Sequence, residues 1–291
     1  MAGGKGASLA RMTRSGLPVP EGFVIVAGAL GIALDSGGRR LEVAALLESD
    51  RSEGQVAAAV REIVLALGQP KGLEAEIVAA MRHLGPETPV AVRSSASAED
   101  SKAASFAGQH ETHLNVLGAA SVWQRVRECW ASFFSERALF YRARKASLSD
   151  LAMAVVVQRQ LQPEKAGVMF TIDPVRRRRD QLIVEAVWGL GEPLLSGAVT
   201  PDHYVVARDG KVKQARVAVQ PVAILPLPGG GTSEEPLEPD RGASRVLDEA
   251  ELAELAALGN RLQEYFGAPQ DVEWAYQQGK LYVLQSRPVT A

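Results

Sequence analysis

The chain has 291 residues, of which 46% are hydrophobic and 23% charged, and its formal net charge is −2. This is a globular composition with room for two or three subdomains. It lacks the basic field of a nucleic-acid-binding protein, and one cysteine, Cys129, excludes a disulfide framework. No apolar run approaches the ~20 residues of a membrane helix. We therefore expect a cytoplasmic protein whose partners are neither nucleic acids nor membranes.

The first third of the chain is helical in pattern. Residues 7–15 predict a short helix that is opened by Gly3-Gly4-Lys5-Gly6 and stopped by Gly16. A strand is predicted over residues 23–26, and helical periodicity then dominates residues 27–84.

Two predicted strands, residues 90–94 and 111–116, flank a small polar loop that contains Gly108. A long helix is predicted over residues 121–145. Cys129 lies in its apolar pattern, so we interpret it as a buried small hydrophobe and not as a nucleophile.

Short strands and turns characterise the second half. A loop is predicted over residues 221–245, followed by a helix that Asp248 caps and that extends to about residue 266. The predicted strands cover residues 153–158, 166–172, 181–186, 203–207, 272–276 and 281–285. We infer a helix-rich lobe over residues 1–150, a strand-rich lobe over residues 151–291, and a ligand cleft between them.

Several polar residues in this pattern suit a phosphate ligand. Glycines beside Lys5, at the start of a helix, let the backbone approach an anion, although terminal glycines are often only flexible. Arg93 ends a strand, and its planar guanidinium suits phosphate oxygens. The alternative for Arg93 is a structural ion pair with Glu99 or Asp100. Residues 101–108 form either a phosphate-binding loop or an ordinary surface loop.

Two strand ends offer groups to the rest of a nucleotide. Gln158 is placed to read a base edge, and Glu185 suits a ribose diol or a cation-linked water. For both, solvation at a strand end is the simpler alternative. His203 is interpreted as a strand-surface histidine, and the basic run Arg176–Arg179 as an exposed turn.

The final hairpin has the clearest chemical pattern. Asp271 and Glu273 alternate on one strand, as Gln285 and Arg287 do on the returning strand, so each pair shares a face. Carboxylate and amide oxygens suit Mg²⁺, and Arg287 would complete a charge clamp. The alternative is a solvent-facing polar stripe.

Ten blocks of the sequence resemble, in order, the nucleotide-binding domain of the phosphoenolpyruvate synthase, pyruvate phosphate dikinase and rifampin phosphotransferase family. Among them are GGKGASLARM, VAVRSSASAED, SFAGQHET, GVMFTIDP, VEAVWGLGE and LYVLQSRPVT. The resemblance implies an α+β fold of the ATP-grasp type with ATP and Mg²⁺ as cofactors. The resemblance implies that phosphate is contacted by Lys5, Arg93, Arg137 and Arg287, and that Gly108 belongs to a phosphate-binding loop. It implies that Gln158 lies near the adenine and Glu185 near the nucleotide. It also implies that Mg²⁺ is held by Glu273 and Gln285, assisted by Asp271. Arg93 and Arg287 are the implied catalytic pair.

The family relays phosphate through a histidine on a separate domain, and none of the four histidines here lies in such a segment. The sequence also departs from the family before Gly3 and over residues 211–247. The resemblance therefore implies a phosphohistidine domain or subunit as partner, in cis or in trans, with an acceptor such as pyruvate or an antibiotic handled elsewhere. A self-contained ATP-grasp kinase or ligase, and a non-catalytic nucleotide-binding module, are the alternatives.

Overall fold

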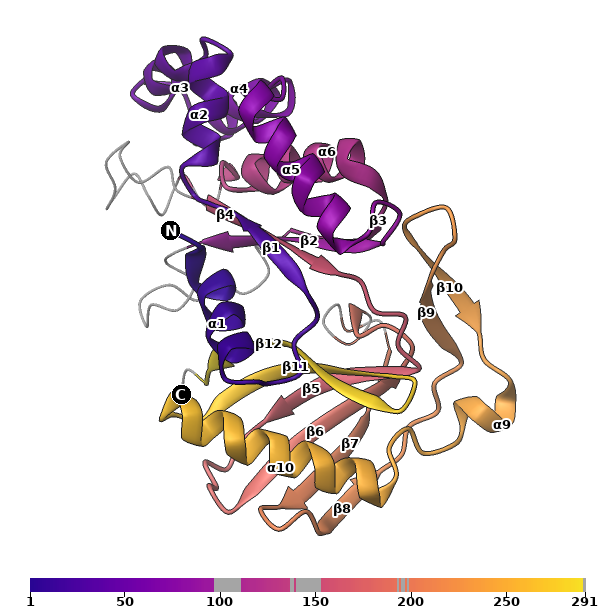
Figure 1. Cartoon of the computed structure of the whole chain (residues 1–291). Helices are drawn as coiled ribbons and strands as arrows, with labels where there is room; N and C mark the ends of the chain where they lie inside the picture. The colour runs from indigo at the N-terminus through magenta and orange to yellow at the C-terminus, as the bar shows by residue number, and fades with distance from the viewer. Residues whose placement is uncertain are drawn as a thin grey trace. The chain divides into compact units, whose positions relative to one another are not determined.

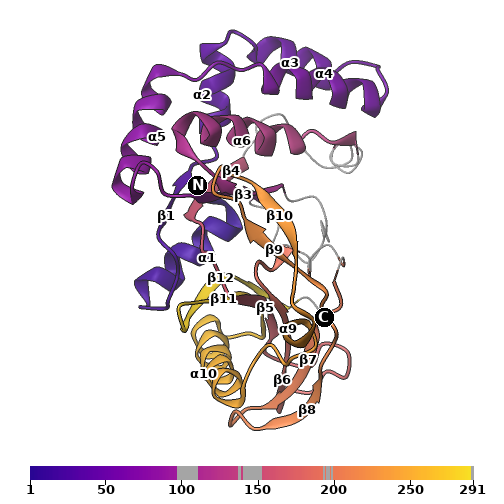
Figure 2. The same ribbon diagram turned by 90° about the vertical axis from the view of Figure 1, so that its right-hand side faces the viewer.

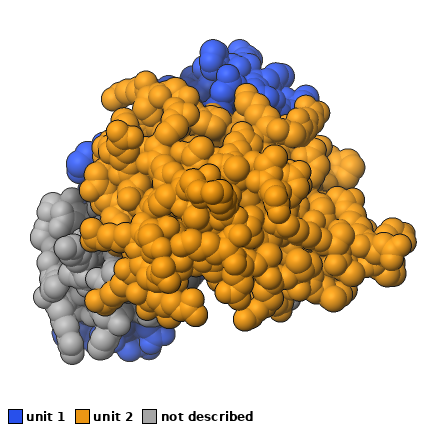
Figure 3. Space-filling view, turned by 90° about the horizontal axis from the view of Figure 1, so that it is seen from below, with its two compact units in different colours: residues 1–7, 21–160 blue, residues 8–20, 161–291 orange. Residues whose placement is uncertain are grey.

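The computed structural model describes residues 1–96, 111–136, 139, 153–192, 194, 197 and 199–289. The chain divides into two compact units, coloured in Figure 3. Unit 1 comprises residues 1–7 and 21–160, and unit 2 comprises residues 8–20 and 161–291. Within the described ranges, no helix is long and apolar enough to cross a membrane.

Unit 1 is built on a four-stranded antiparallel sheet of order β1-β4-β2-β3. The strands are β1 (Gly22–Ile25), β2 (Val90–Ala96), β3 (Thr112–Val116) and β4 (Met153–Arg159). Apolar residues of one face, such as Val92 and Val157, share a buried core with the helices. Figure 1 shows these helices gathered on one side of the sheet. They are α2 (Ala29–Ser36), α3 (Arg40–Leu47), α4 (Glu53–Leu65), α5 (Lys71–Leu84) and α6 (Gly118–Ser132).

The helical prediction for residues 27–84 is confirmed, but the long helix predicted to reach residue 145 is wrong. α6 ends at Ser132, and Phe133–Ser135 leave the helix. Phe133 and Phe134 are both buried there, with their rings edge to face at 5.4 Å. The Ser135 carbonyl then accepts from Leu139 N, and Glu136 and Leu139 are again helical. Serine is a favoured helix N-cap, which fits Ser135 in this position.

Unit 2 contains a six-stranded antiparallel sheet of order β12-β11-β5-β6-β7-β8. Its strands are β5 (Lys165–Phe170), β6 (Gln181–Trp188), β7 (Asp202–Ala207), β8 (Val212–Arg216), β11 (Gln270–Gln277) and β12 (Lys280–Pro288). The helix α10 (Glu249–Phe266) lies along one face, as Figures 1 and 2 show. A Cβ on Gly259 of α10 would come within 2.7 Å of Leu182 and 3.0 Å of the Met169 sulfur. The predicted Asp248 cap is confirmed as a capping box with Glu251.

The prediction of a loop over residues 221–245 is wrong. This segment forms a two-stranded hairpin, β9 (Val222–Pro226) and β10 (Thr232–Pro236), followed by the short helix α9 (Pro239–Gly242). Gly230 and Gly231 have positive φ angles and make the turn. Pro226 and Pro236 end the strands, where a missing N–H is tolerated. The hairpin is joined to the end of β6 through the bond from Leu190 N to Ile224 O.

Residues with positive φ close several turns, including the stop predicted at Gly16. Gly16 closes α1 (Gly3–Arg14) with φ of 71°, and Gly210 turns β7 into β8 with φ of 88°. Gln278 and Gly279 both have positive φ, as a two-residue turn between antiparallel strands requires. The predicted α+β class is confirmed. Helices pack on one face of the four-stranded sheet in unit 1 and on one face of the six-stranded sheet in unit 2.

Candidate functional site

One face of the unit 2 sheet carries a row of polar residues. Gln285 on β12 is the cross-strand partner of Glu273 on β11, and Glu273 is the partner of Val168 on β5. The row continues from Val168 to Glu185 on β6 and from Glu185 to His203 on β7. Cross-strand partners point to the same side of a sheet, so these side chains share one face. It is the face opposite α10, because Leu182 and Met169, which contact that helix, alternate with this row.

Gln285 is the most unusual residue of the row. Only 9% of it is exposed, and its carbonyl Oε1 is buried with no hydrogen-bond partner. An unsatisfied buried acceptor costs about 1–3 kcal/mol, so native proteins keep few of them. Glu273 is its direct cross-strand partner, so the two side chains share one face. A carboxylate beside an unsatisfied amide oxygen is a donor set that Mg²⁺ prefers, so these residues fit that ion.

The protein supplies only part of the coordination that such an ion needs. Among the residues that the structure describes, no group of three or more His, Cys, Asp or Glu could hold a metal. Mg²⁺ commonly retains waters and takes substrate phosphates as its other ligands. The pair therefore suits a metal that arrives with a phosphate ligand better than a permanently bound ion.

Asp271 and Arg287 form the next pair on the same face. Nε and Nη2 of Arg287 both lie 2.9 Å from Asp271 Oδ2. The carboxylate is 15% exposed and the guanidinium 53%. Burial raises the pKa of Asp271, and the charge and hydrogen bond of Arg287 oppose that rise. Asp271 thus holds the arginine in place while much of its guanidinium stays accessible.

Glu185 and His203 form a third pair, two and three strands away from Glu273. His203 Nδ1 lies 3.5 Å from Glu185 Oε1. Both side chains are about one-third exposed, at 35% for His203 and 31% for Glu185. The pair is therefore accessible from the same face as Glu273.

In unit 1, the start of α1 lies against β2 of the four-stranded sheet. Lys5 Nζ donates to the Ser94 carbonyl at 2.8 Å, and Gly6 N donates to Ser95 Oγ at 3.2 Å. Gly3 has a φ of 68°, and a Cβ there would overlap the Ser95 carbonyl oxygen. The glycines are thus required by close backbone packing, and they bring Lys5 next to the strand that carries Arg93.

Arg93 and Gln158 share the face of the unit 1 sheet that is turned away from the helical core. Arg93 pairs with Val156, and Gln158 pairs with Ala91, so both point to one side. Arg93 is 7% exposed, Gln158 4% and Lys5 8%. A Cβ on Gly6 would touch Val24, which lies in the same row as Val156 and Arg93. The structure therefore brings Lys5, Arg93 and Gln158 to one face of this sheet.

Two predicted site residues, Gly108 and Arg137, lie outside the described residues, as does the alternative ion pair of Arg93 with Glu99 or Asp100. Sequence reasoning missed Gly167 on β5. A Cβ there would overlap the Glu185 carbonyl and approach the Trp274 ring to 2.6 Å. Gly167 thus allows β6 and β11, which carry Glu185 and Glu273, to pack around β5. The glycine within an otherwise apolar strand was the available signal.

The interpretation of Cys129 is confirmed. Its side chain is fully buried, and burial raises the pKa of the thiol to about 12. A thiol of this kind is not a nucleophile at neutral pH.

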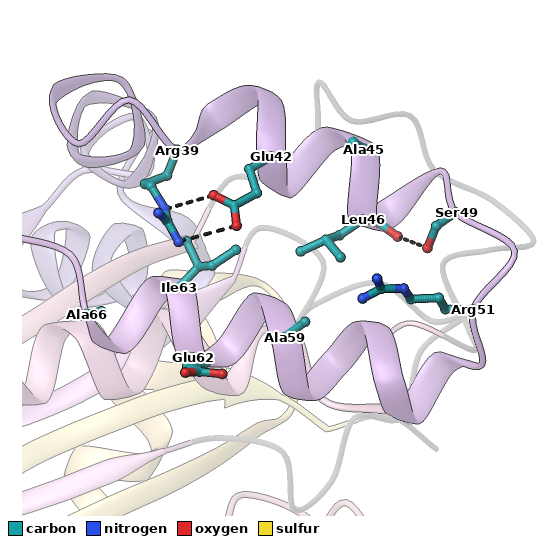
Figure 4. A pocket seen from close by; sticks show the side chains of 10 residues that line it. All are labelled: Arg39, Glu42, Ala45, Leu46, Ser49, Arg51, Ala59, Glu62, Ile63 and Ala66. Carbon is teal, nitrogen blue, oxygen red and sulfur yellow. Dashed lines mark hydrogen bonds and ion pairs between the residues drawn. The ribbon is translucent and has the colours of Figure 1, made fainter.

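A hollow of about 610 Å³ lies between α3 and α4 in unit 1. Figure 4 shows Arg39 paired with Glu42 on one wall, with Glu62 and Ile63 on the other. Of the predicted site residues that the structure describes, none lines it. The hollow is therefore separate from those residues.

The chain has distant likenesses to solved structures. D-alanyl-alanine synthetase A from Vibrio cholerae aligns over 98% of this chain and 55% of its own, with 11% identity and a TM-score of 0.40. A biotin carboxylase from Campylobacter jejuni aligns over 99% of this chain and 40% of its own, with 12% identity and a TM-score of 0.34.

Sequence comparison is far more specific. A probable phosphoenolpyruvate synthase of Methanothermobacter thermautotrophicus is 41% identical over all of this chain and 44% of its own length. A rifampicin phosphotransferase of Bacillus cereus is 36% identical over all of this chain and 34% of its own length. This chain thus spans less than half of these relatives. The family model of the pyruvate phosphate dikinase AMP/ATP-binding domain matches residues 1–291. The chain therefore belongs to the pyruvate phosphate dikinase AMP/ATP-binding domain family.

Proposed function

We propose that this chain binds Mg²⁺ and ATP and presents a phosphoryl group of ATP to a histidine on another domain or subunit. The observation that carries the proposal is the buried, unsatisfied Oε1 of Gln285 opposite Glu273, beside the Asp271–Arg287 pair. The chain belongs to an AMP/ATP-binding domain family, which supports ATP as the nucleotide ligand. The relatives named above are more than twice as long as their match, which leaves room for the histidine and the final acceptor elsewhere.

Each residue has a distinct part in the proposal. Lys5 and Arg93 bind phosphate oxygens, and Arg287, held by Asp271, neutralises charge on the transferring group. Gln158 contacts the adenine. Mg²⁺, when bound by Glu273 and Gln285, would supply charge neutralisation to the phosphates. Phosphoryl transfer requires mainly positioning and electrostatic stabilisation, which these residues provide without covalent chemistry of their own.

The strand spacing favours a ribose role for Glu185. Neighbouring strands lie about 4.8 Å apart, so Glu185, two strands from Glu273, has its backbone roughly 10 Å away. Mg²⁺ holds its ligands at about 2.0–2.1 Å. We therefore assign Glu185 to the ribose hydroxyls and not to the ion of Glu273 and Gln285.

In the proposed reaction, a nitrogen of the partner histidine forms a bond to the β-phosphorus of ATP as the bond between that phosphorus and the α-phosphate oxygen breaks, which releases AMP. Water then cleaves the bond between the two transferred phosphates, so that phosphohistidine and inorganic phosphate remain. The phosphohistidine then serves pyruvate or another small acceptor. A cytoplasmic location, expected from the sequence, fits a reaction that draws on ATP.

Calorimetry of Mg·ATP binding tests the site. We expect Arg93→Ala and Glu273→Ala each to weaken binding about 10- to 100-fold, the effect of losing a charge-assisted contact. Arg82→Ala and Glu264→Ala are matched controls, because both side chains are exposed, on α5 and α10 respectively. Unchanged affinity in both site variants would refute the proposed site.

Phosphate transfer requires a second assay. The chain is mixed with ATP and the part of the Bacillus cereus rifampicin phosphotransferase that lies beyond its match, and AMP and acid-labile phosphoprotein are measured. Formation of both, dependent on Arg287, supports the proposal. Rapid ATP turnover without that partner would favour a self-contained kinase, and tight ATP binding without transfer would favour a non-catalytic module.

A further inference from the structure

His203 occupies a position in the polar row that the proposed function does not use. It lies on β7 as the direct cross-strand partner of Glu185, with Nδ1 3.5 Å from Glu185 Oε1. The other charged neighbour in its row is Arg216 on β8, which is exposed. The imidazole therefore lies between a carboxylate that it contacts and a solvent-exposed guanidinium.

Stability does not explain this pair. Both side chains are about one-third exposed, and ion pairs at such sites contribute little to folding. The pair lies on the face that carries Glu273 and Gln285, opposite the face packed on α10. A pair that contributes little to the fold but lies beside the nucleotide-facing residues points to a role in binding.

We propose that His203 is a positioning residue that orients the Glu185 carboxylate toward the ribose hydroxyls of the nucleotide. This inference rests on the proposed function. A glutamate side chain has three rotatable bonds, and fixing it on binding costs conformational entropy. An imidazole anchored on the neighbouring strand restricts Glu185 before the nucleotide arrives. It thereby sets the selectivity for a ribonucleotide over a deoxyribonucleotide.

The test compares the affinities of ATP, 2′-deoxyATP and 3′-deoxyATP by calorimetry on the full chain with Mg²⁺. His203→Ala is expected to weaken ATP binding about three- to tenfold and to leave the deoxynucleotides less affected, so that discrimination falls. His203→Gln, whose amide still donates, should recover part of it. Arg216→Ala, on the other side of His203, is the matched control and should behave as wild type.

A double variant distinguishes a positioning role of His203 from a direct contact of His203 with the nucleotide and from a loss of folding. In a Glu185→Gln background, His203→Ala should cause no further loss of discrimination, because it acts through that carboxylate. Thermal unfolding without nucleotide should be unchanged by His203→Ala. Wild-type discrimination in His203→Ala, or equal losses for all three nucleotides, would overturn the inference while leaving the proposed function intact. If the wild type binds no ATP, both fail together.

Discussion

Replacing Gln285 by methionine should stabilise the protein without Mg·ATP and destabilise it, relative to wild type, with Mg·ATP present. The reason is the buried Oε1 of Gln285, which has no hydrogen-bond partner. Methionine has nearly the same length and shape but no acceptor to leave unsatisfied. The substitution removes a desolvation penalty from the free protein and a ligand from the metal site.

The magnitude follows from the burial of this one atom. An unsatisfied buried acceptor costs about 1–3 kcal/mol, so the free energy of unfolding should rise by at least about 1 kcal/mol in the free variant. For a body of this size that is a shift of roughly 2–4 °C in melting temperature. Mg·ATP at 100 times its dissociation constant would stabilise wild type by about 2.7 kcal/mol. The variant would gain much less, and the order of the two melting temperatures would reverse.

Melting curves of both proteins, with and without saturating Mg·ATP, measure this reversal. Gln277→Met is the matched control on the same hairpin, because Gln277 Oε1 accepts from Gln162 N at 2.6 Å. Its loss leaves a donor unpaired and should lower the melting temperature under both conditions. A Gln285→Met variant that melts below wild type without Mg·ATP would refute the argument from the unsatisfied oxygen. An undiminished shift with Mg·ATP would refute the metal role.

Three further outcomes are expected. Burial raises the pKa of Asp271, so the folded state holds the proton of this carboxyl more tightly than the unfolded state does. The free energy of unfolding of wild type, relative to that of Asp271→Asn, should therefore fall as the pH rises from about 3 through the folded pKa. Denaturant titrations at several pH values measure this difference, and a rise would contradict the prediction. Gly3→Ala should weaken ATP binding, since its Cβ would overlap Ser95, whereas Gly16→Ala, with φ of 71° but nothing within 4 Å, should only lower stability by about 1 kcal/mol. Cys129 should resist alkylation at pH 8 in the native state and react after unfolding, because burial raises its pKa to about 12; rapid labelling of the native protein would show that it is exposed.

Local signals in the sequence predicted most of the elements and turns. The α10 cap at Asp248 and the turn at Gln278-Gly279 depend on residues within a few positions of each other, so they can be inferred directly. The errors came where longer-range packing decided. Buried phenylalanines ended α6 at Ser132, and pairing of β9 with β10 ordered a stretch whose prolines and glycines indicated a loop.

The candidate site divides in the same way. The sequence alone determined that Asp271 and Glu273 share a face, as do Gln285 and Arg287, because side chains alternate along a strand. It also determined the family, since its blocks occur in order along the chain. Only the tertiary structure decided that Glu273 lies opposite Gln285, that Gln285 keeps a buried oxygen without a partner, and that His203 contacts Glu185. The physical reason is that register and burial arise from strands distant in sequence, which no local pattern specifies.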